Sequence, residues 1–220
     1  MTDTNTAFVE DFAAMRAAMV ASQLRPNGVT SFALIDALGR VPREAFVPAE
    51  RSAAAYIDRA VPLWNGRALN PPMTTALLLN AAEIGTGSRV LIVGAATGYA
   101  LALAVSIAAE VTGVESDPTL AARASENVPN ARVTTGALDI GSAAHAPYDA
   151  IVIDGAIEFV PDALIAQLSP DGRLTTALVE SGVARLAVGR RGGSGFALSP
   201  FVDAEAVVLP GFAHAREFVF

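Results

Sequence analysis

Apolar residues recur at helical spacing in the N-terminal part of the chain. This spacing predicts a helix over Ala7–Leu24, with apolar positions at Phe8, Phe12, Met15, Met19 and Val20. Proline and glycine within Arg25–Gly28 should end this helix, and Thr30 is expected to cap a second helix that runs through Leu38. A third helix is predicted over Thr74–Ala82, after the proline-rich segment Arg67–Met73.

A different pattern begins near residue 89, where short apolar runs alternate with helical segments. The apolar runs predict strands over Arg89–Val93, Glu110–Val114, Arg132–Thr134, Asp149–Ile153 and Arg173–Leu178. The segments between them predict helices over Tyr99–Ala109, Pro118–Glu126 and Pro161–Leu168. This alternation favours an α/β fold in which helices cover both faces of a mostly parallel sheet.

The C-terminal part reads as short strands with glycine and proline between them. The runs RLAVGRR, GFALSPF, EAVVLP and REFVF predict antiparallel strands that complete the sheet, with a hairpin turn at Gly192–Gly195. We expect one compact unit, made of an N-terminal helical extension over residues 1–82 and an α/β core over residues 83–220.

Composition and charge narrow the class of protein. The chain has 220 residues, of which 52% are hydrophobic, and this is enough for one large core. It has no cysteine, which excludes disulfides and thiolate ligands and fits the reducing cytoplasm. A net charge of −7 argues against general nucleic-acid binding. The acidic N-terminus predicts no signal peptide, and no apolar run predicts a membrane span.

The stretch from Arg89 to Asp117 carries the first candidate chemistry. It predicts a strand ending at Gly94, a turn of small residues to Gly98, a helix, and a second strand with Glu115 at its tip. Such a unit can hold an adenosine group, because the turn lets backbone approach the ligand and the acid accepts both ribose hydroxyls. The alternative is a structural glycine turn followed by a solvated acid.

A second candidate is Asp154, which follows the apolar run YDAIVI. The carboxyl ends of strands face the binding crevice in open α/β sheets, so Asp154 can orient a substrate or a cofactor amine there. The alternative is an Asp-Gly turn formed with Gly155. Asp171–Gly172 is expected to be a turn only. His145 and His214 lack a cluster of possible ligands around them, so no metal site is predicted.

Several segments taken together resemble the protein-L-isoaspartate O-methyltransferase family. They lie between Met19 and Leu178 and read MVASQL, DALGRVPREAFVP, AYIDRAVPL, GRALNPPMTTALLL, VLIVGAATGY, VTGVESDPTLAARASENV and APYDAIVIDGAIEFVPDALIAQLSPDGRL. The resemblance implies a Rossmann-like fold, S-adenosyl-L-methionine as methyl donor, and methylation of the carboxyl group of damaged aspartyl residues. It also implies a role in protein repair.

The chain departs from this family at several places. Where the family has Thr-Ile-Ser before a proline, with a hydroxyl near the acceptor carboxylate, this chain has Ala68, Leu69 and Asn70. An acid before the first glycine of the donor loop is replaced by Ile92, and a glycine of the loop by Ala96. The aspartate that contacts the adenine end is replaced by Ala137, within Gly136–Leu138.

These matches define the candidate site. Asn70 is the catalytic candidate, because its amide can orient an acceptor carboxylate in place of the missing hydroxyl. The alternative for Asn70 is a turn residue before Pro71. The candidate cofactor-binding residues are Gly94, Ala95, Ala96, Thr97, Gly98, Glu115, Ala137, Leu138 and Asp154.

The resemblance leaves three functions open. The first is methylation of a protein or peptide that bears isoaspartate. The second is methylation of another acceptor, such as a small-molecule carboxylate, because the altered segment lies where the acceptor binds. The third is a non-catalytic binding protein that keeps the fold, which the changes at Ile92 and Ala137 motivate. The sequence does not indicate an oligomeric state.

Overall fold

The structure is a computed structural model that describes residues 11–193 and 195–214. The predicted start of the first helix at Ala7 and the run REFVF lie outside the described residues. No helix in the described part of the chain has the length and apolar character needed to cross a membrane.

The N-terminal part is helical, as predicted. It begins with α1 (Phe12–Ala18), continues through a π-helical segment over Met19–Leu24, and turns at Gly28, whose φ is +94°. The next helix, α2, spans Phe32–Arg40. Its cap is Ser31, which accepts a hydrogen bond from the backbone of Leu34, so the prediction of Thr30 as the cap was wrong by one residue.

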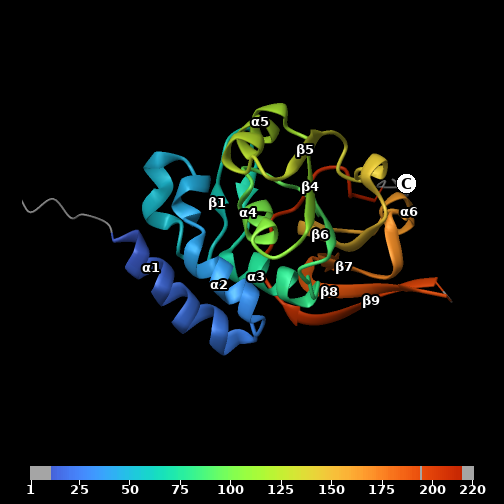
Figure 1. The fold of residues 1–220 in the computed structure, drawn as a ribbon, viewed down its shortest axis with the longest axis horizontal. Coiled ribbons are helices and arrows are strands. Elements are labelled where there is room, and N and C mark those ends of the chain that lie inside the picture. Colours follow the sequence, from blue (N-terminus) through green and yellow to red (C-terminus); the bar gives the residue numbers. More distant parts are fainter. Residues whose placement is uncertain (1–10, 194, 215–220) are drawn as a thin grey trace, which may run out of the picture.

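A seven-stranded sheet forms the centre of the molecule, with strand order β5-β4-β3-β6-β7-β8-β9 (Figure 1). The strands are β3 (Arg89–Val93), β4 (Glu110–Glu115), β5 (Arg132–Thr135), β6 (Tyr148–Ile157), β7 (Leu168–Glu180), β8 (Val183–Gly192) and β9 (Gly195–Asp203). The first five pair in parallel, and β7, β8 and β9 pair antiparallel. The predicted mixed sheet is therefore confirmed. The order in which the strands are added reverses between β3 and β6: β4 and β5 follow on one side of β3, and β6 to β9 follow on the other. Open α/β sheets bind ligands at such a point.

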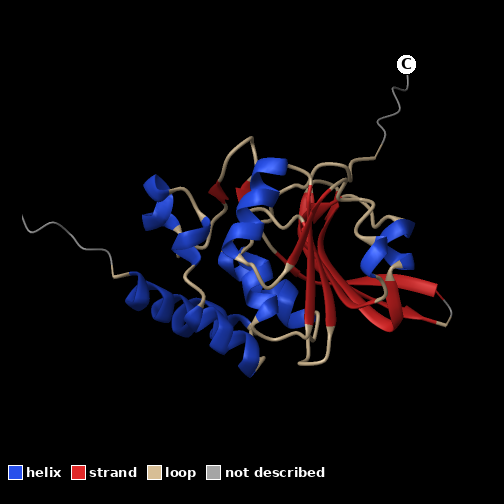
Figure 2. Ribbon diagram, turned by 45° about the horizontal axis from the view of Figure 1, so that its top comes forward, coloured by secondary structure: helices blue, strands red, loops and turns tan. Residues whose placement is uncertain are grey.

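Helices cover the two faces of the sheet unequally, as Figure 2 shows. The helices that follow α2 are α3 (Pro72–Ala81), α4 (Tyr99–Val105), α5 (Pro118–Asn127) and α6 (Asp162–Ala166). One face packs against α2 to α5 in a core that includes Val90, Ile92 and Val152. The other face carries Leu91 and Val93 and packs against α6 and a C-terminal segment. Alternate side chains of β3 thus enter different cores.

Three short segments differ from the sequence-based expectation. Asp154 and Gly155 lie inside β6, so they do not form a turn. Asp171 has a φ of +62° within the span of β7, where the pairing with β6 shifts register, so Asp171–Gly172 belongs to a bulge. The run EAVVLP does not add a strand to the edge of the sheet. Instead it makes an isolated parallel bridge, between Val208 and Ala156.

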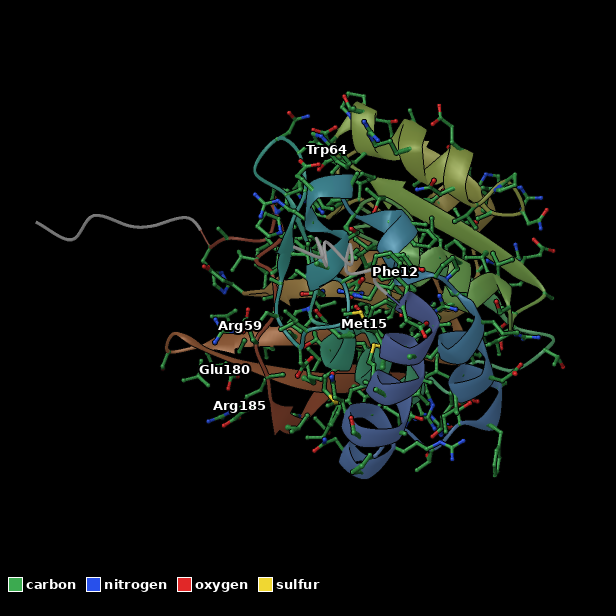
Figure 3. The ribbon with its side chains drawn as sticks, turned by 90° about the vertical axis from the view of Figure 1, so that its left-hand side faces the viewer. Phe12, Met15, Arg59, Trp64, Glu180 and Arg185 are labelled. Atoms are coloured by element: carbon green, nitrogen blue, oxygen red, sulfur yellow. The ribbon has the colours of Figure 1, made fainter. Side chains whose placement is uncertain are left out.

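A small hairpin joins the N-terminal part to the sheet. It consists of β1 (Val61–Pro62) and β2 (Ala68–Leu69), which pair antiparallel. Its tip reaches α5: the Arg123 guanidinium carbon lies 3.9 Å from the centroid of the Trp64 ring, and the label of Trp64 in Figure 3 marks this corner. The hairpin thereby places the residues between Trp64 and Asn70 over the carboxyl ends of the strands.

Candidate functional site

The turn after β3 has the backbone conformation of a ligand-binding glycine loop. Gly94 and Gly98 have φ values of +80° and +101°, and Ala96 has a φ of +49°. The amides of Gly94 and Ala95 both donate to the Val114 carbonyl at 3.0 Å, which ties the turn to the end of β4. Ala96 thus holds a left-handed conformation that favours glycine, at the position where the family has glycine.

Glu115 lies at the tip of β4 and is fully buried. Its Oε2 accepts from the amide of Ala96 at 2.8 Å, and its Oε1 accepts from the amides of Ser116 and Asp117 at 2.8 and 3.0 Å. The Arg67 guanidinium also donates to Oε1 at 2.5 Å. The carboxylate therefore connects the glycine turn, the start of α5 and the β1–β2 hairpin.

A cavity of about 510 Å³ opens beside this ion pair. Its lining comes from the hairpin (Asn65, Gly66, Arg67), the end of β4 and start of α5 (Ser116, Asp117, Pro118), and the C-terminal segment (Val208, Leu209, Pro210). Asn65 donates to Asp117 at 2.7 Å across its rim. Backbone amides from the start of α5 and this side-chain pair lower the pKa of the partly exposed Asp117 carboxyl.

A second polar cluster lies around Asn70 at the same end of the sheet. Asn70 Nδ2 donates to Asp154 Oδ1 at 2.9 Å, and Asn70 Oδ1 accepts from the amide of Val207 at 2.7 Å. Thr75, on α3, donates from its hydroxyl to the same Asp154 Oδ1 at 2.9 Å. Asn70 is 2% exposed and Asp154 is 7% exposed, so this hydrogen-bond network is shielded from bulk water.

Arg43 places a fully buried positive charge beside this cluster. Its Nε donates to the Ala55 carbonyl at 2.6 Å, its Nη2 donates to the Asn70 carbonyl, and its guanidinium carbon lies 4.6 Å from the centroid of the Tyr99 ring. Burial lowers the pKa of Arg43, while Tyr99 and Asp154 act in the opposite direction. Burial raises the pKa of the Asp154 carboxyl, and the hydrogen bonds from Asn70 and Thr75 partly offset this rise.

The C-terminal segment over residues 204–212 crosses the carboxyl ends of the strands. The amide of Ala156 donates to the Val207 carbonyl at 2.7 Å, and the amide of Leu209 donates to the Ala156 carbonyl at 2.9 Å. A side chain at Gly155 would place its Cβ 2.5 Å from Leu209 Cγ, and one at Gly94 would lie 3.0 Å from Leu209 Cδ1. Leu209 therefore fills the space above two glycines of neighbouring strands, one directly after β3 and one inside β6.

The structure brings most of the predicted site residues into two groups. Gly94 to Gly98 and Glu115 form the first, and Asn70 and Asp154 form the second. None of the predicted cofactor-binding residues is among the residues that line the cavity, and the side chains of three of them also lie outside both groups. The Thr97 hydroxyl donates to the Phe46 carbonyl at 2.6 Å, Leu138 is buried in the core beside Leu209, and Ala137 is exposed with no polar side chain.

Sequence reasoning missed Arg43, Arg67, Thr75, Val207 and Leu209. Only Arg43 could have been found from the sequence. It is a charged residue in the largely apolar segment VPREAFVP, and a charge at such a position is expected to have a polar partner in the fold. The others depend on contacts between distant segments. Arg67 and Glu115 are 48 residues apart, and Asn70 and Val207 are 137 residues apart.

The sheet order, the glycine turn and the acid at the tip of the next strand define a Rossmann-like methyltransferase fold. Two solved structures share it. One is a protein-L-isoaspartate O-methyltransferase with a TM-score of 0.77 and 20% identity, covering 91% of this chain and 66% of that chain. The other is from Plasmodium falciparum, in complex with S-adenosyl-L-homocysteine, with a TM-score of 0.73 and 18% identity, covering 90% of this chain and 98% of that chain.

Sequence comparison identifies the family. The model of the protein-L-isoaspartate(D-aspartate) O-methyltransferase family matches residues 15–196. The protein-L-isoaspartate O-methyltransferase of Methylorubrum populi is 40% identical over 165 residues, which cover 73% of this chain and 78% of that relative. The chain belongs to the protein-L-isoaspartate O-methyltransferase family, so the predicted family and fold class are confirmed.

Proposed function

We propose that the protein transfers a methyl group from S-adenosyl-L-methionine to the free carboxylate of an isoaspartyl residue in a protein or peptide. Family membership supports the reaction, and one structural observation supports its location. The cavity beside Glu115 and the cluster around Asn70 lie at the same end of the sheet, and only β2, Ala68–Leu69, separates Arg67 from Asn70. A donor site and an acceptor site would then be neighbours.

The residues around the cavity fit an adenosine-containing donor. Its volume of about 510 Å³ lies within the range of small-molecule sites, and its lining includes the Asp117 carboxylate, the Asn65 amide and the Arg67 guanidinium. Asp117 and Asn65 line the cavity and would hold the ribose and the adenine edge, with Glu115 behind Arg67. Leu209 covers Gly94, so this side chain would have to move before the donor could approach the glycine turn. Both Glu115 oxygens already accept hydrogen bonds within the protein, so Arg67 has to share or release Oε1 when a ribose hydroxyl binds. When bound, the donor supplies a methyl group on a positively charged sulfur, which is a strong electrophile.

The acceptor needs orientation more than activation. An ionised carboxylate is already a nucleophile, so no general base is required, and the task of the protein is to align the two reactants and exclude water. Asn70 is the residue placed to orient the carboxylate, because each amide nitrogen has two N–H groups and only one of those of Asn70 donates to Asp154. The burial of Asn70, Asp154 and Arg43 would keep water away from this part of the site.

Two measurements test the proposal. Calorimetric titration with S-adenosyl-L-homocysteine measures the donor site, and methyl transfer to an isoaspartyl peptide, with the matched aspartyl peptide as control, measures the acceptor. We expect binding and transfer to the isoaspartyl peptide only. Asn70→Ala should lower the transfer rate without changing the affinity for S-adenosyl-L-homocysteine. Binding without transfer to either peptide would contradict the assignment of the acceptor, and absence of binding would contradict the enzyme itself.

A second candidate is methylation of a different acceptor. The observation that favours it is the carboxylate of Asp154, which lies 2.9 Å from the amide of Asn70 and would repel an anionic acceptor if its charge were not balanced. Transfer to an amine or a neutral small molecule, with none to the isoaspartyl peptide, would support this function over the first.

A further inference from the structure

We propose that Asp154 is a positioning residue for methyl transfer: it fixes the side-chain amide of Asn70 in one rotation, so that the second N–H of Asn70 is presented to the acceptor carboxylate. This inference rests on the proposed function. It extends that function by adding a residue that acts through Asn70, and by giving a reason why an acid stands inside β6.

The hydrogen bonds leave Asn70 only one orientation. Its Oδ1 accepts from the Val207 amide at 2.7 Å, and its Nδ2 donates to Asp154 Oδ1 at 2.9 Å. A rotation by 180° would place the amide nitrogen against another N–H group and the carbonyl oxygen against a carboxylate. Both bonds would be lost and two repulsive contacts would replace them, because a backbone N–H cannot accept and a carboxylate cannot donate.

The partner of Asn70 is itself held in place. Thr75 donates to the same Oδ1 at 2.9 Å, from the first turn of α3, and its side chain is fully buried. The backbone of Asp154 belongs to β6, in the middle of the sheet. The position of Oδ1 is thus set by a strand on one side and a helix on the other, and a rigid support of this kind is what a precisely oriented donor requires.

The surrounding charges are compatible with an anionic acceptor. Arg43 donates from Nη2 to the Asn70 carbonyl, while the side chain of the same asparagine donates to Asp154. A buried cation therefore lies on the backbone side of Asn70 and a carboxylate lies on its side-chain side. Because the two charges oppose each other, an acceptor carboxylate that approaches Asn70 does not meet a site of net negative charge.

The exchanged pair Asn70→Asp with Asp154→Asn separates a functional role from a structural one. In this double variant, the residue at position 70 still accepts from Val207. The new asparagine at 154 donates one N–H to position 70 and the other to the Thr75 oxygen, since a hydroxyl can also accept. All three hydrogen bonds and the net charge are kept. Only the second N–H at position 70 is lost, and a carboxylate oxygen replaces it.

Two single variants at position 154 form a matched set. Asp154→Asn can keep Oδ1 as the acceptor for both Asn70 and Thr75, whereas Asp154→Ala removes it and releases Asn70. A hydrogen bond to a charged group contributes about 1.5–3 kcal/mol, which corresponds to about 10- to 100-fold in a rate or binding constant. We therefore expect Asp154→Ala to lose about 10- to 100-fold in kcat/KM for the isoaspartyl peptide, and Asp154→Asn to recover most of it.

The assays are methyl transfer with varied peptide concentration and calorimetric titration with S-adenosyl-L-homocysteine, both on the full chain. We expect the double variant to melt at the wild-type temperature, to bind S-adenosyl-L-homocysteine as the wild type does, and to lose at least about 10-fold in kcat/KM for the peptide. A double variant as active as the wild type would overturn the role of Asp154, and so would equal activity of the alanine and asparagine variants. The comparison of Asp154→Ala with Asp154→Asn still tests the proposal if the double variant does not fold.

The outcome for the wild type distinguishes the two proposals. A wild-type protein that binds S-adenosyl-L-homocysteine but does not methylate the isoaspartyl peptide overturns the proposed function, and the role of Asp154 with it. A wild-type protein that methylates the peptide, together with an equally active double variant, overturns the orienting roles of Asn70 and Asp154 and leaves the methyl-transfer activity itself in place.

Discussion

Replacing Leu209 by alanine tests whether the C-terminal segment is a structural part of the site. Leu209 is 3% exposed and lies over Gly94 and Gly155, with its side-chain carbons at 3.0 and 2.5 Å from the Cβ positions that those residues lack. Leucine-to-alanine changes in cores cost about 2.7–5.0 kcal/mol, and the cost rises with the size of the cavity that remains.

The surroundings of Leu209 place this variant in the upper part of that range. Glycine has no side chain that can move into the space, and Gly94 and Gly155 are held by the central sheet, Gly94 directly after β3 and Gly155 inside β6. The cavity can therefore collapse very little, and we expect a loss of about 4 kcal/mol in the free energy of unfolding. For a chain of this size, each kcal/mol lowers Tm by about 2–4 °C, so the expected shift is about 8–16 °C.

Thermal and urea unfolding followed by circular dichroism measure this loss. Val208→Ala is the control, because Val208 is the adjacent residue of the same segment and is 71% exposed; its change should stay within about 0.5 kcal/mol. If Leu209→Ala melted within about 2 °C of Val208→Ala, which corresponds to less than about 1 kcal/mol, Leu209 would not be packed on the glycines. The reasoning about the C-terminal segment would then fail.

Three further predictions concern the polar groups and the glycine turn. Ala96→Gly should stabilise the protein by up to about 1 kcal/mol in urea unfolding, because Ala96 has a φ of +49°; a destabilised variant would contradict the strain. Arg67→Leu should lower the free energy of unfolding by about 3 kcal/mol, since it leaves the buried Glu115 carboxylate without its cation, and a loss below about 1 kcal/mol would show that this charge is screened. Burial raises the pKa of Asp154, so the folded state binds a proton more tightly than the unfolded state does. The stability of the wild type relative to Asp154→Asn should therefore increase as the pH falls from 7 to about 4, and a difference that does not vary with pH would refute this.

The parts of the fold that could be predicted from the sequence are those with a local cause. β3 and the central part of β6 are continuous apolar runs because both faces of the sheet are covered, and each was predicted within a few residues. Asp154 and Gly155 were harder, because a polar residue followed by glycine ordinarily marks a turn. Here β6 continues through them, since Asn70 and Thr75 satisfy the carboxylate from outside the sheet.

Contacts between distant segments set the limit of the prediction. The run EAVVLP has the composition of an edge strand, but the sheet already ends at β9, and Leu209 of this run packs into the core at the strand ends instead. The sequence around Arg67 does not indicate that it belongs to the site, because its partner, Glu115, lies on another element. Local pattern cannot reveal such pairs, because neither partner requires the other until the chain is folded.

The departures of this chain from its family differ between the two halves of the site. On the donor side, Ile92 is fully buried in the core and Ala137 is exposed with no polar atom in its side chain, so neither can make the polar contact with the donor that the resemblance implies for other members of the family. On the acceptor side, Asn70 replaces a hydroxyl and comes with its own partners, Asp154 and Val207. A loss without replacement weakens binding, whereas an exchanged group that is fixed by two hydrogen bonds keeps a directed donor in place. We therefore expect the chain to differ from its relatives chiefly in its affinity for the methyl donor, and less in its handling of the acceptor.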